Sequence, residues 1–114
     1  MGDCLFCKIV SGEIPSPRVY ENDYTIVIDD INPVVKVHAL IITKEHYQDV
    51  LALDQDNAGA LGGIQQAIAE TAKIKGVSGS GFRLISNCGA DGGQTVPHLH
   101  YHLIGGQPLR TQIV

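Results

Sequence analysis

Several features that would point to other classes of protein are missing from this chain of 114 residues. Lysine and arginine number eight against twelve acidic residues, giving a net charge of −4, so no basic surface for a nucleic acid is expected. No window reaches the roughly 18 consecutive apolar residues of a membrane span. The start MGDCLFCKIV lacks the pattern of a secretory signal, and Phe6 breaks the myristoylation pattern. We therefore expect a cytoplasmic protein with neither a nucleic-acid nor a membrane partner.

The chain also lacks the markers of several domain organisations. Nothing in it is long enough and rich enough in Pro, Gly and Ser to be an interdomain linker, and we find no internal repeat and no GxGxxG dinucleotide fingerprint. Structural disulfides are rare in intracellular proteins, so Cys4 and Cys7 are interpreted as reactive thiols or metal ligands. With 44% hydrophobic and 18% charged residues, the composition predicts one folded domain over residues 1–114.

Segments typical of strands outnumber those typical of helices. A β-hairpin is predicted for RVYEND and YTIVIDD, and further strands for VHALIIT, which is apolar enough to be central, GFRLISN and VPHLHYHLIGG. Apolar residues at helical spacing predict one long helix between a capping Asp54 and Gly76. Because strands and helices do not alternate regularly, an α+β fold with an antiparallel sheet is favoured over a doubly wound one.

The stretch HLHYH places His98, His100 and His102 at every second position. On a strand, all three imidazoles would point to one face, because side chains alternate with period 2. A lone histidine is usually structural, but several neighbouring groups that can become cationic are costly to bury without partners. The triplet therefore indicates either a metal site or nucleophilic and acid–base catalysis.

The loop before this triplet helps to choose between the two readings. Its glycines would let the backbone approach phosphate oxygens closely, and neutral donors are supplied by Gln94 and Thr95. By itself the loop could equally be an ordinary flexible turn. Together with the histidines, it favours chemistry at phosphorus.

The segment HLHYHLI matches the His-φ-His-φ-His-φ-φ signature, with φ apolar, and the chain resembles the histidine triad (HIT) family. The resemblance extends through FCKIVSGEIP, DDINPVVKVHALIITKEH and NCGADGGQTVPHLHYHLIGG, and is closest to the short, nucleoside-phosphoramidase-like Hint branch. It implies a HIT-like fold, an antiparallel five-stranded sheet with one long and one short helix. It also implies a homodimer in which two sheets form one continuous sheet of ten strands.

The resemblance assigns roles to four histidines. His100 would be the nucleophile, carrying the nucleoside monophosphate as a covalent nucleotidyl-histidine. His38 would support and orient the triad, and His102 would hydrogen-bond the phosphate or the neighbouring backbone. His98 completes the triad. No catalytic metal is required, since phosphoryl transfer to histidine can proceed by positioning and hydrogen bonding.

The resemblance also implies a binding site for a purine nucleotide or nucleoside phosphoramidate. Asp30 would accept hydrogen bonds from the ribose hydroxyls. The phosphate and leaving group would be held by residues of the glycine-rich loop: Asn87, Gly93, Gln94 and Thr95. Apolar walls around the base would be formed by Phe6, Ile9, Ile14, Ile28, Ile31 and Leu40, for which simple core packing is the alternative.

The spacing Cys4-Leu-Phe-Cys7 lets two thiolates reach one Zn²⁺ but supplies only half of a tetrahedral site. Once His38, His100 and His102 are assigned to catalysis, His46 and His98 remain to complete it. A bacterial subset of the family, which this chain resembles, carries structural zinc in this arrangement. We therefore predict one zinc per chain on Cys4, Cys7, His46 and His98. The alternatives are a redox dithiol or two free thiols.

The function predicted from these residues is hydrolysis of a nucleoside 5′-phosphoramidate or a similar mixed anhydride. A dinucleoside polyphosphate hydrolase is the enzymatic alternative, although the chain lacks the extra length expected for that branch. A purine-nucleotide-binding regulator with incidental activity is the alternative from another class. The tail QPLRTQIV lacks the tryptophan of some eukaryotic relatives, so the leaving group stays open, as does the choice between adenine and guanine.

Overall fold

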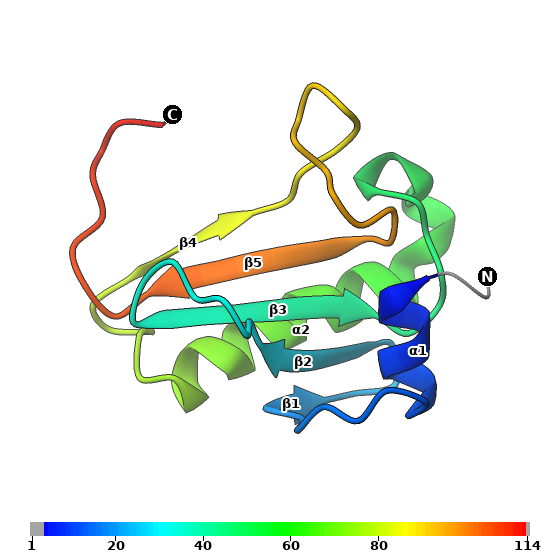
Figure 1. The fold of residues 1–114 in the computed structure, drawn as a ribbon, viewed down its shortest axis with the longest axis horizontal. Helices are drawn as coiled ribbons and strands as arrows, with labels where there is room; N and C mark the ends of the chain where they lie inside the picture. The colour runs from blue at the N-terminus through cyan, green and yellow to red at the C-terminus, as the bar shows by residue number, and fades with distance from the viewer. Residues whose placement is uncertain (1–3, 114) are drawn as a thin grey trace.

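The computed structural model describes residues 4–113. Five antiparallel strands form one sheet in the order β1-β2-β3-β5-β4 (Figure 1). The elements are α1 (Leu5–Ser11), β1 (Tyr20–Glu21), β2 (Thr25–Asp29), β3 (Val37–Thr43), α2 (Ala58–Ile74), β4 (Phe82–Ile85) and β5 (His100–Gly105), with 3₁₀ turns at Val50–Ala52 and Gln55–Asn57. The predicted α+β class, hairpin and central strand are confirmed, as is the HIT-like arrangement of one long and one short helix.

The two helices cover opposite faces of the sheet. One buried cluster joins α2 to side chains that include Val27, Ile41 and Leu103. A second cluster joins α1 to the alternate side chains of the same strands, including Ile28 and Leu40. Since both faces are covered, β3 is apolar almost throughout, as a strand buried on both sides must be.

The long helix α2 begins at Ala58, after a 3₁₀ turn that starts where the sequence predicts the helix cap. Asp54 caps the preceding 3₁₀ turn, and its own amide donates to the Asn57 side chain in a capping box. Gly63 weakens the intrinsic helix propensity but is needed for packing, because a Cβ there would lie 2.7 Å from the Cβ of Tyr24. The helix glycines therefore let the β1–β2 hairpin pack closely on α2.

The short helix α1 is held at both ends. The Cys4 side chain accepts a hydrogen bond from the Cys7 amide at 3.3 Å and caps its start. The Arg18 guanidinium donates to the carbonyls of Ile9 (3.1 Å) and Val10 (3.3 Å) near its end. A helix of this length gains little from its own hydrogen bonds, so packing on the sheet must stabilise it.

The last strand is shorter than predicted. The sequence indicates a strand over residues 96–106, but β5 begins only at His100. His98 lies in a bend after Pro97, where its amide donates to the carbonyl of Val96 at 2.8 Å. The expectation that all three histidines share one strand is therefore wrong for His98, because the turn that follows Pro97 uses its backbone differently.

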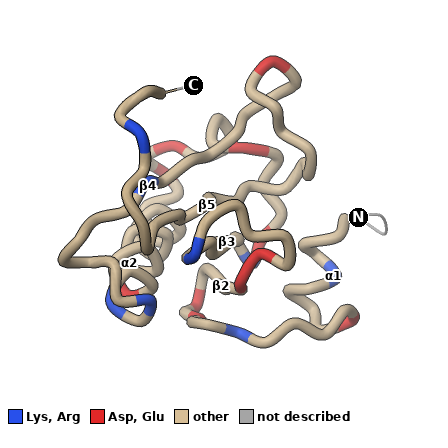
Figure 2. Tube along the Cα trace, turned by 60° about the vertical axis from the view of Figure 1, so that its left-hand side comes forward, with Lys and Arg blue, Asp and Glu red and all other residues tan. Residues whose placement is uncertain are grey.

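Charged residues are scattered over the fold rather than gathered by sign (Figure 2). Lys44 pairs with Glu21 at 2.8 Å, and Lys75 pairs with Asp29 at 2.6 Å. The lysines in these pairs are already neutralised by carboxylates and are therefore less available to bind the phosphates of a nucleic acid. Within residues 4–113, no helix combines the length and apolar character needed to cross a membrane.

Candidate functional site

The register of β3 and β5 brings three histidines together. Leu40 lies opposite His102 and Ile42 opposite His100, while His38 stands one step along the same face of β3. The ring centroids of His38 and His102 are 5.2 Å apart, as are those of His100 and His102. With Asp30, these three histidines form what we call the Asp30 cluster.

Hydrogen bonds within the Asp30 cluster determine where its protons lie. The Val34 amide donates to Nδ1 of His38 at 3.2 Å, so a neutral His38 carries its proton on Nε2. That Nε2 lies 2.9 Å from Nδ1 of His102 and 3.3 Å from a carboxylate oxygen of Asp30. His102 Nδ1 therefore accepts, and its proton is left on Nε2.

The ring of His100 has the opposite arrangement. Its Nδ1 lies 2.7 Å from the backbone carbonyl of His98, and a carbonyl can only accept, so Nδ1 carries the proton. The unshared pair of His100 is then on Nε2, the atom that can act as a nucleophile. The Phe6 ring meets the His100 ring edge-on, with centroids 4.9 Å apart.

The environment keeps His102 uncharged at neutral pH. Burial is the largest influence lowering the pKa of His102, and the neighbouring rings of His100 and His38 lower it further. The Asp30 carboxylate opposes this shift but does not reverse it. A neutral His102 therefore presents an Nε2–H that can donate a hydrogen bond.

A cavity of about 240 Å³ opens beside these rings. It is lined by Val34, His38, Ile85, Asn87, His102 and Ile104. Sequence reasoning did not assign Val34, Ile85 or Ile104 to the site, although the pairing of Ile85 with His102 follows once β4 and β5 are aligned. A larger hollow of about 550 Å³ beside Gly76 and Gly106 has no histidine or cysteine in its lining.

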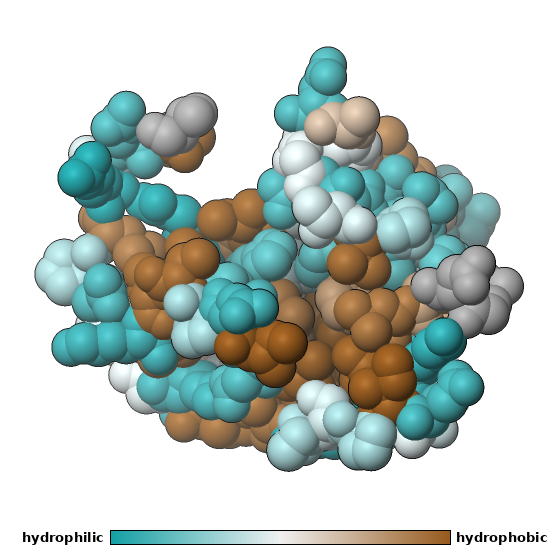
Figure 3. Space-filling model, in the orientation of Figure 1, coloured by the Kyte–Doolittle hydropathy of each residue, from teal (hydrophilic) through white to brown (hydrophobic). Residues whose placement is uncertain are grey.

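Apolar surface and an open notch mark the α1 side of the molecule. Figure 3 shows apolar surface over the middle of this face, below the gap between the C-terminal segment and the glycine-rich loop. Asn87 is braced by donating to the carbonyl of Gly92 at 2.7 Å. Gly93 has φ of +75°, a conformation that favours glycine. The glycine-rich loop is thus an ordered turn, held by its own hydrogen bonds, beside the histidines.

Two other loop residues, Gln94 and Thr95, are also expected to hold the phosphate and leaving group. The Gln94 side chain accepts from the Gly89 amide at 2.9 Å and donates to the carbonyls of Gln48 (2.8 Å) and Val96 (3.1 Å). Its amide group therefore braces the loop, whereas Thr95 is exposed. For both residues a contact with substrate stays a prediction.

The predicted apolar walls divide into two groups. Phe6, Ile9, Ile28 and Leu40 are buried together between α1 and the sheet, and Ile14 packs against them. Ile31 is 91% exposed and lies outside this cluster. Core packing therefore accounts for the four buried residues, and their contact with a base stays a prediction.

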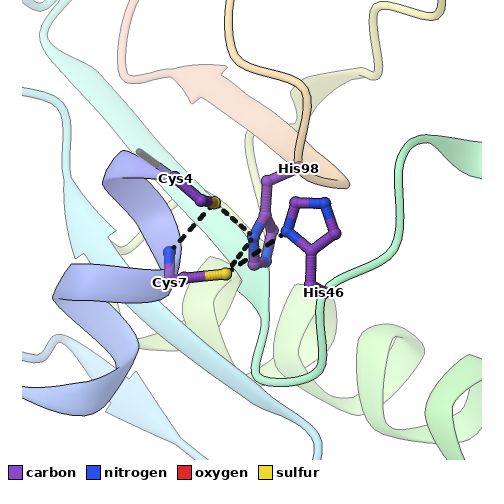
Figure 4. Close-up of side chains that lie close together, drawn as sticks. All are labelled: Cys4, Cys7, His46 and His98. Atoms are coloured by element: carbon purple, nitrogen blue, oxygen red, sulfur yellow. Dashed lines mark hydrogen bonds between the residues drawn. The ribbon is translucent and has the colours of Figure 1, made fainter. Parts of the chain in front are cut away.

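Cys4 and Cys7, at the start of α1, lie close to the side chains of His46 and His98, as Figure 4 shows. Nδ1 of His98 lies 3.2 Å from the sulfur of Cys4 and 3.5 Å from that of Cys7, and Nδ1 of His46 lies 3.3 Å from the Cys7 sulfur. All four donor atoms fall within 4.8 Å of one another, close enough to bind one metal ion. We call this set the cysteine cluster.

In the cysteine cluster, one ring nitrogen is free to bind a metal and one thiol must first lose its proton. Nε2 of His98 lies 2.7 Å from the carbonyl of Thr43, which places the proton on Nε2 and leaves Nδ1 free to ligate. Burial, with further contributions from Cys4, raises the pKa of Cys7 to about 11. Without a metal this thiol is therefore protonated at neutral pH, and a bound cation must displace the proton.

This fold, with a His-x-His-x-His segment beside a glycine-rich turn, defines the class of the protein. The chain matches the HIT domain family over residues 11–109 and belongs to the HIT family. It is 38% identical to the purine nucleoside phosphoramidase of Escherichia coli K12 over 107 residues, covering 94% of this chain and 90% of that protein. It is also 38% identical to protein HitA of Neisseria gonorrhoeae, covering 92% of this chain and 97% of that protein.

Solved structures agree with this assignment. A HIT family hydrolase from Clostridium thermocellum superposes with a TM-score of 0.95 at 46% identity, covering 100% of this chain and 99% of that one. A histidine triad protein from Clostridium difficile superposes with a TM-score of 0.91 at 44% identity, covering 98% and 97%. The antiparallel five-stranded sheet with two helices is thus the HIT fold.

Proposed function

We propose that the protein hydrolyses nucleoside 5′-phosphoramidates, releasing a nucleoside monophosphate through a covalent intermediate on His100. The observation that carries this proposal is the hydrogen bond from Nδ1 of His100 to the carbonyl of His98, which leaves Nε2 unprotonated. The resemblance to the phosphoramidase of Escherichia coli supports the choice of substrate class.

In the first step, Nε2 of His100 attacks phosphorus while the phosphorus–nitrogen bond breaks and its electron pair leaves with the amine. The departing nitrogen takes a proton from a solvent water, and the Nε2–H of His102 hydrogen-bonds a phosphate oxygen, where it stabilises the charge that develops. The nucleotidyl-His100 ring carries a positive charge. Its Nδ1–H stays bonded to the His98 carbonyl, which stabilises that charge.

In the second step, water attacks phosphorus and the bond to His100 breaks, returning the electron pair to Nε2. The proton of the attacking water passes to the hydroxide that the first step left in solvent, while the Nε2–H of His102 still hydrogen-bonds a phosphate oxygen. His38 keeps Nδ1 of His102 hydrogen-bonded through both steps, so that the Nε2–H of His102 stays available to the phosphate.

The remaining predicted residues would bind the nucleotide. Asn87, Gly93 and Thr95 would hold the phosphate and leaving group from the glycine-rich loop, and Asp30 would accept from the ribose. One Asp30 oxygen already accepts from the Asn32 amide at 2.8 Å, and the other faces His38. A ribose hydroxyl would therefore share the second oxygen with His38.

The test is a turnover screen of purified protein with adenosine and guanosine phosphoramidates and with dinucleoside polyphosphates. We expect phosphoramidates to be the better substrates and rapid quenching to trap a nucleotidyl adduct that mass spectrometry maps to His100. Preferential cleavage of dinucleoside polyphosphates would favour the alternative hydrolase. Tight nucleotide binding without turnover or adduct would favour a regulator.

We further propose that the cysteine cluster holds one zinc ion. Two thiolates and two imidazoles are a common closed donor set for structural zinc, and the Thr43 carbonyl behind His98 fixes the required tautomer. Elemental analysis of protein purified without added metal should find about one equivalent of zinc. Absence of zinc, together with a melting temperature that added zinc leaves unchanged, would refute this assignment.

The edge of the sheet supports a proposed homodimer. Within the described residues 4–113, β4 pairs with β5 alone, and its Phe82 and Leu84 are 37% and 38% exposed. An open strand edge with apolar side chains favours pairing with a second copy, which would give the continuous ten-stranded sheet. Light scattering should report twice the chain mass, and Leu84→Lys should shift the protein toward the monomer.

A further inference from the structure

His98 takes part in both clusters. Its Nδ1 faces the sulfurs of Cys4 and Cys7, whereas its backbone carbonyl accepts the Nδ1–H of His100 at 2.7 Å. The side chain is fully buried, and its Nε2 is held by the Thr43 carbonyl at 2.7 Å. The ring that faces the two sulfurs and the carbonyl that orients His100 therefore belong to one residue, and both are held by hydrogen bonds.

The peptide that carries this carbonyl is also held from its other side. The amide of Leu99 belongs to the same planar unit and donates to the carbonyl of Tyr47 at 2.7 Å. Tyr47 directly follows His46, whose Nδ1 lies 3.3 Å from the sulfur of Cys7. A metal ion on His46 and His98 would therefore tie together the two segments that orient this peptide.

Helix α1 makes a second connection to His100. Phe6 lies between Cys4 and Cys7 in the sequence, and its ring contacts both His100 and His98, with centroids 4.9 Å and 5.9 Å away. A seven-residue helix is marginal without tertiary support. Ligation by both cysteines would fix its first turn and hold Phe6 against the His100 ring.

We propose that the cysteine cluster is a positioning site for the nucleophile: a metal ion bound there holds the His98 carbonyl and the Phe6 ring, and so aims Nε2 of His100. This inference rests on the proposed function. A misplacement of about 1 Å far from the chemistry can cost about a hundredfold in rate. Metal-free protein should therefore lose roughly ten- to a hundredfold in kcat, while the Kd for adenosine monophosphate changes by less than about twofold.

His46→Ala tests this without touching the substrate cavity, because it removes one ligand and leaves His98 and His100 in place. Its kcat should fall as in metal-free protein, and His46→Cys should restore both zinc and kcat, since thiolate is also a zinc ligand. Arg18→Met is the matched control. It weakens α1 from its other end, where Arg18 contacts the Ile9 and Val10 carbonyls, and should keep both zinc and kcat.

A second readout does not depend on turnover. Long-range ¹H–¹⁵N spectra report which ring nitrogen carries the proton, and His100→Gln assigns the His100 signals by removing them. Zinc-loaded wild type should show His100 protonated on Nδ1, whereas metal-free protein and His46→Ala should show a mixture of tautomers. An unchanged tautomer together with an unchanged kcat in folded, metal-free protein would overturn the proposal.

If removal of zinc unfolds the chain, cadmium-loaded protein replaces metal-free protein, and it is compared with zinc-loaded protein. The larger ion lengthens the metal–ligand bonds, so the His100 signals should shift and kcat should fall. Identical spectra and kcat with both metals would equally overturn the proposal. Failure of zinc-loaded wild type to cleave phosphoramidates would instead refute the proposed function. The tautomer measurement would then still show whether the metal in the cysteine cluster orients the His100 ring.

Discussion

The Asp30 cluster and the cysteine cluster use similar side chains for opposite purposes. In the cysteine cluster, the Thr43 carbonyl lies behind His98 and accepts a hydrogen bond from its Nε2–H, which leaves the inward Nδ1 free for a metal. In the Asp30 cluster, the Val34 amide lies behind His38 and donates to it, so the inward Nε2 must carry the proton. The backbone group behind a ring thus decides whether that ring ligates a metal or donates a hydrogen bond.

This difference also explains why proximity alone does not make a metal site. Suitable atoms of Asp30, His38 and His102 lie within 4.8 Å of one another, as do those of the cysteine cluster. A metal on Nε2 of His38 would require a proton on Nδ1, which would then face the Val34 amide, donor against donor. We therefore expect one metal per chain, in the cysteine cluster.

The largest effect should come from the Asp30 cluster. His100→Ala should lower turnover by at least about three orders of magnitude, because covalent catalysis is lost, while nucleotide binding largely survives. Steady-state kinetics and calorimetry with adenosine monophosphate measure the two quantities. Zinc content should stay at one equivalent as the control, and near-normal turnover would contradict the mechanism.

The largest effect on stability should come from the cysteine cluster. Cys4→Ser combined with Cys7→Ser removes half of the ligands and should lower the melting temperature by on the order of ten degrees, because metal binding contributes to folding free energy. Thermal denaturation followed by circular dichroism measures it. Cys88→Ser is the control, since Cys88 is outside this cluster, and an equal loss there would remove the metal from the explanation.

Asp30→Asn sharpens the comparison within the Asp30 cluster. Because an amide accepts hydrogen bonds more weakly than a carboxylate, ribonucleotides should bind roughly tenfold more weakly. Analogues without the 2′- and 3′-hydroxyls should bind almost as they do to wild type. Calorimetric titration of both ligands measures this, and equal losses would remove Asp30 from the ribose site.

Val34→Pro tests the backbone rule itself. Proline removes the amide that donates to Nδ1 of His38, so that ring could take either tautomer. We expect kcat to fall by roughly severalfold and added zinc to bind in a second equivalent, as counted by elemental analysis after dialysis. Val34→Ala keeps the amide and should bind one equivalent. One equivalent in both variants would contradict the rule.

The smallest effect should be a pH dependence of stability. Burial lowers the pKa of His102 in the folded protein, so below its ordinary value of about 6.5 the unfolded chain binds the proton more readily. The stability that depends on neutral His102 is complete above that pH and is lost as the pH falls. Between pH 7 and 5 the melting temperature should therefore drop a few degrees more in wild type than in His102→Gln.

Much of the fold and site could be predicted from the sequence because the signals are local. The apolar run VHALIIT, the helical spacing that begins at Ala58 and the period of HLHYH are each local patterns, and β3, α2 and the end of β5 lie where these predict. The prediction that His98 lies on the strand is wrong because the alternating pattern of a strand carries no information about the turn after Pro97. The exposure of Ile31 and the bracing role of Gln94 depend on contacts with distant segments that local patterns do not contain.

The sequence by itself determined which reactive side chains this protein has: five histidines and three cysteines at fixed spacings, enough to predict a catalytic set and a metal-binding set that share His98. Only the tertiary structure decided which nitrogen of each ring is free. That choice depends on backbone groups such as the Val34 amide and the carbonyls of Thr43 and His98. Every residue type supplies such a carbonyl, and every type except proline supplies such an amide. Side-chain identity is written in the sequence, but the direction of a backbone hydrogen bond exists only once the chain has folded.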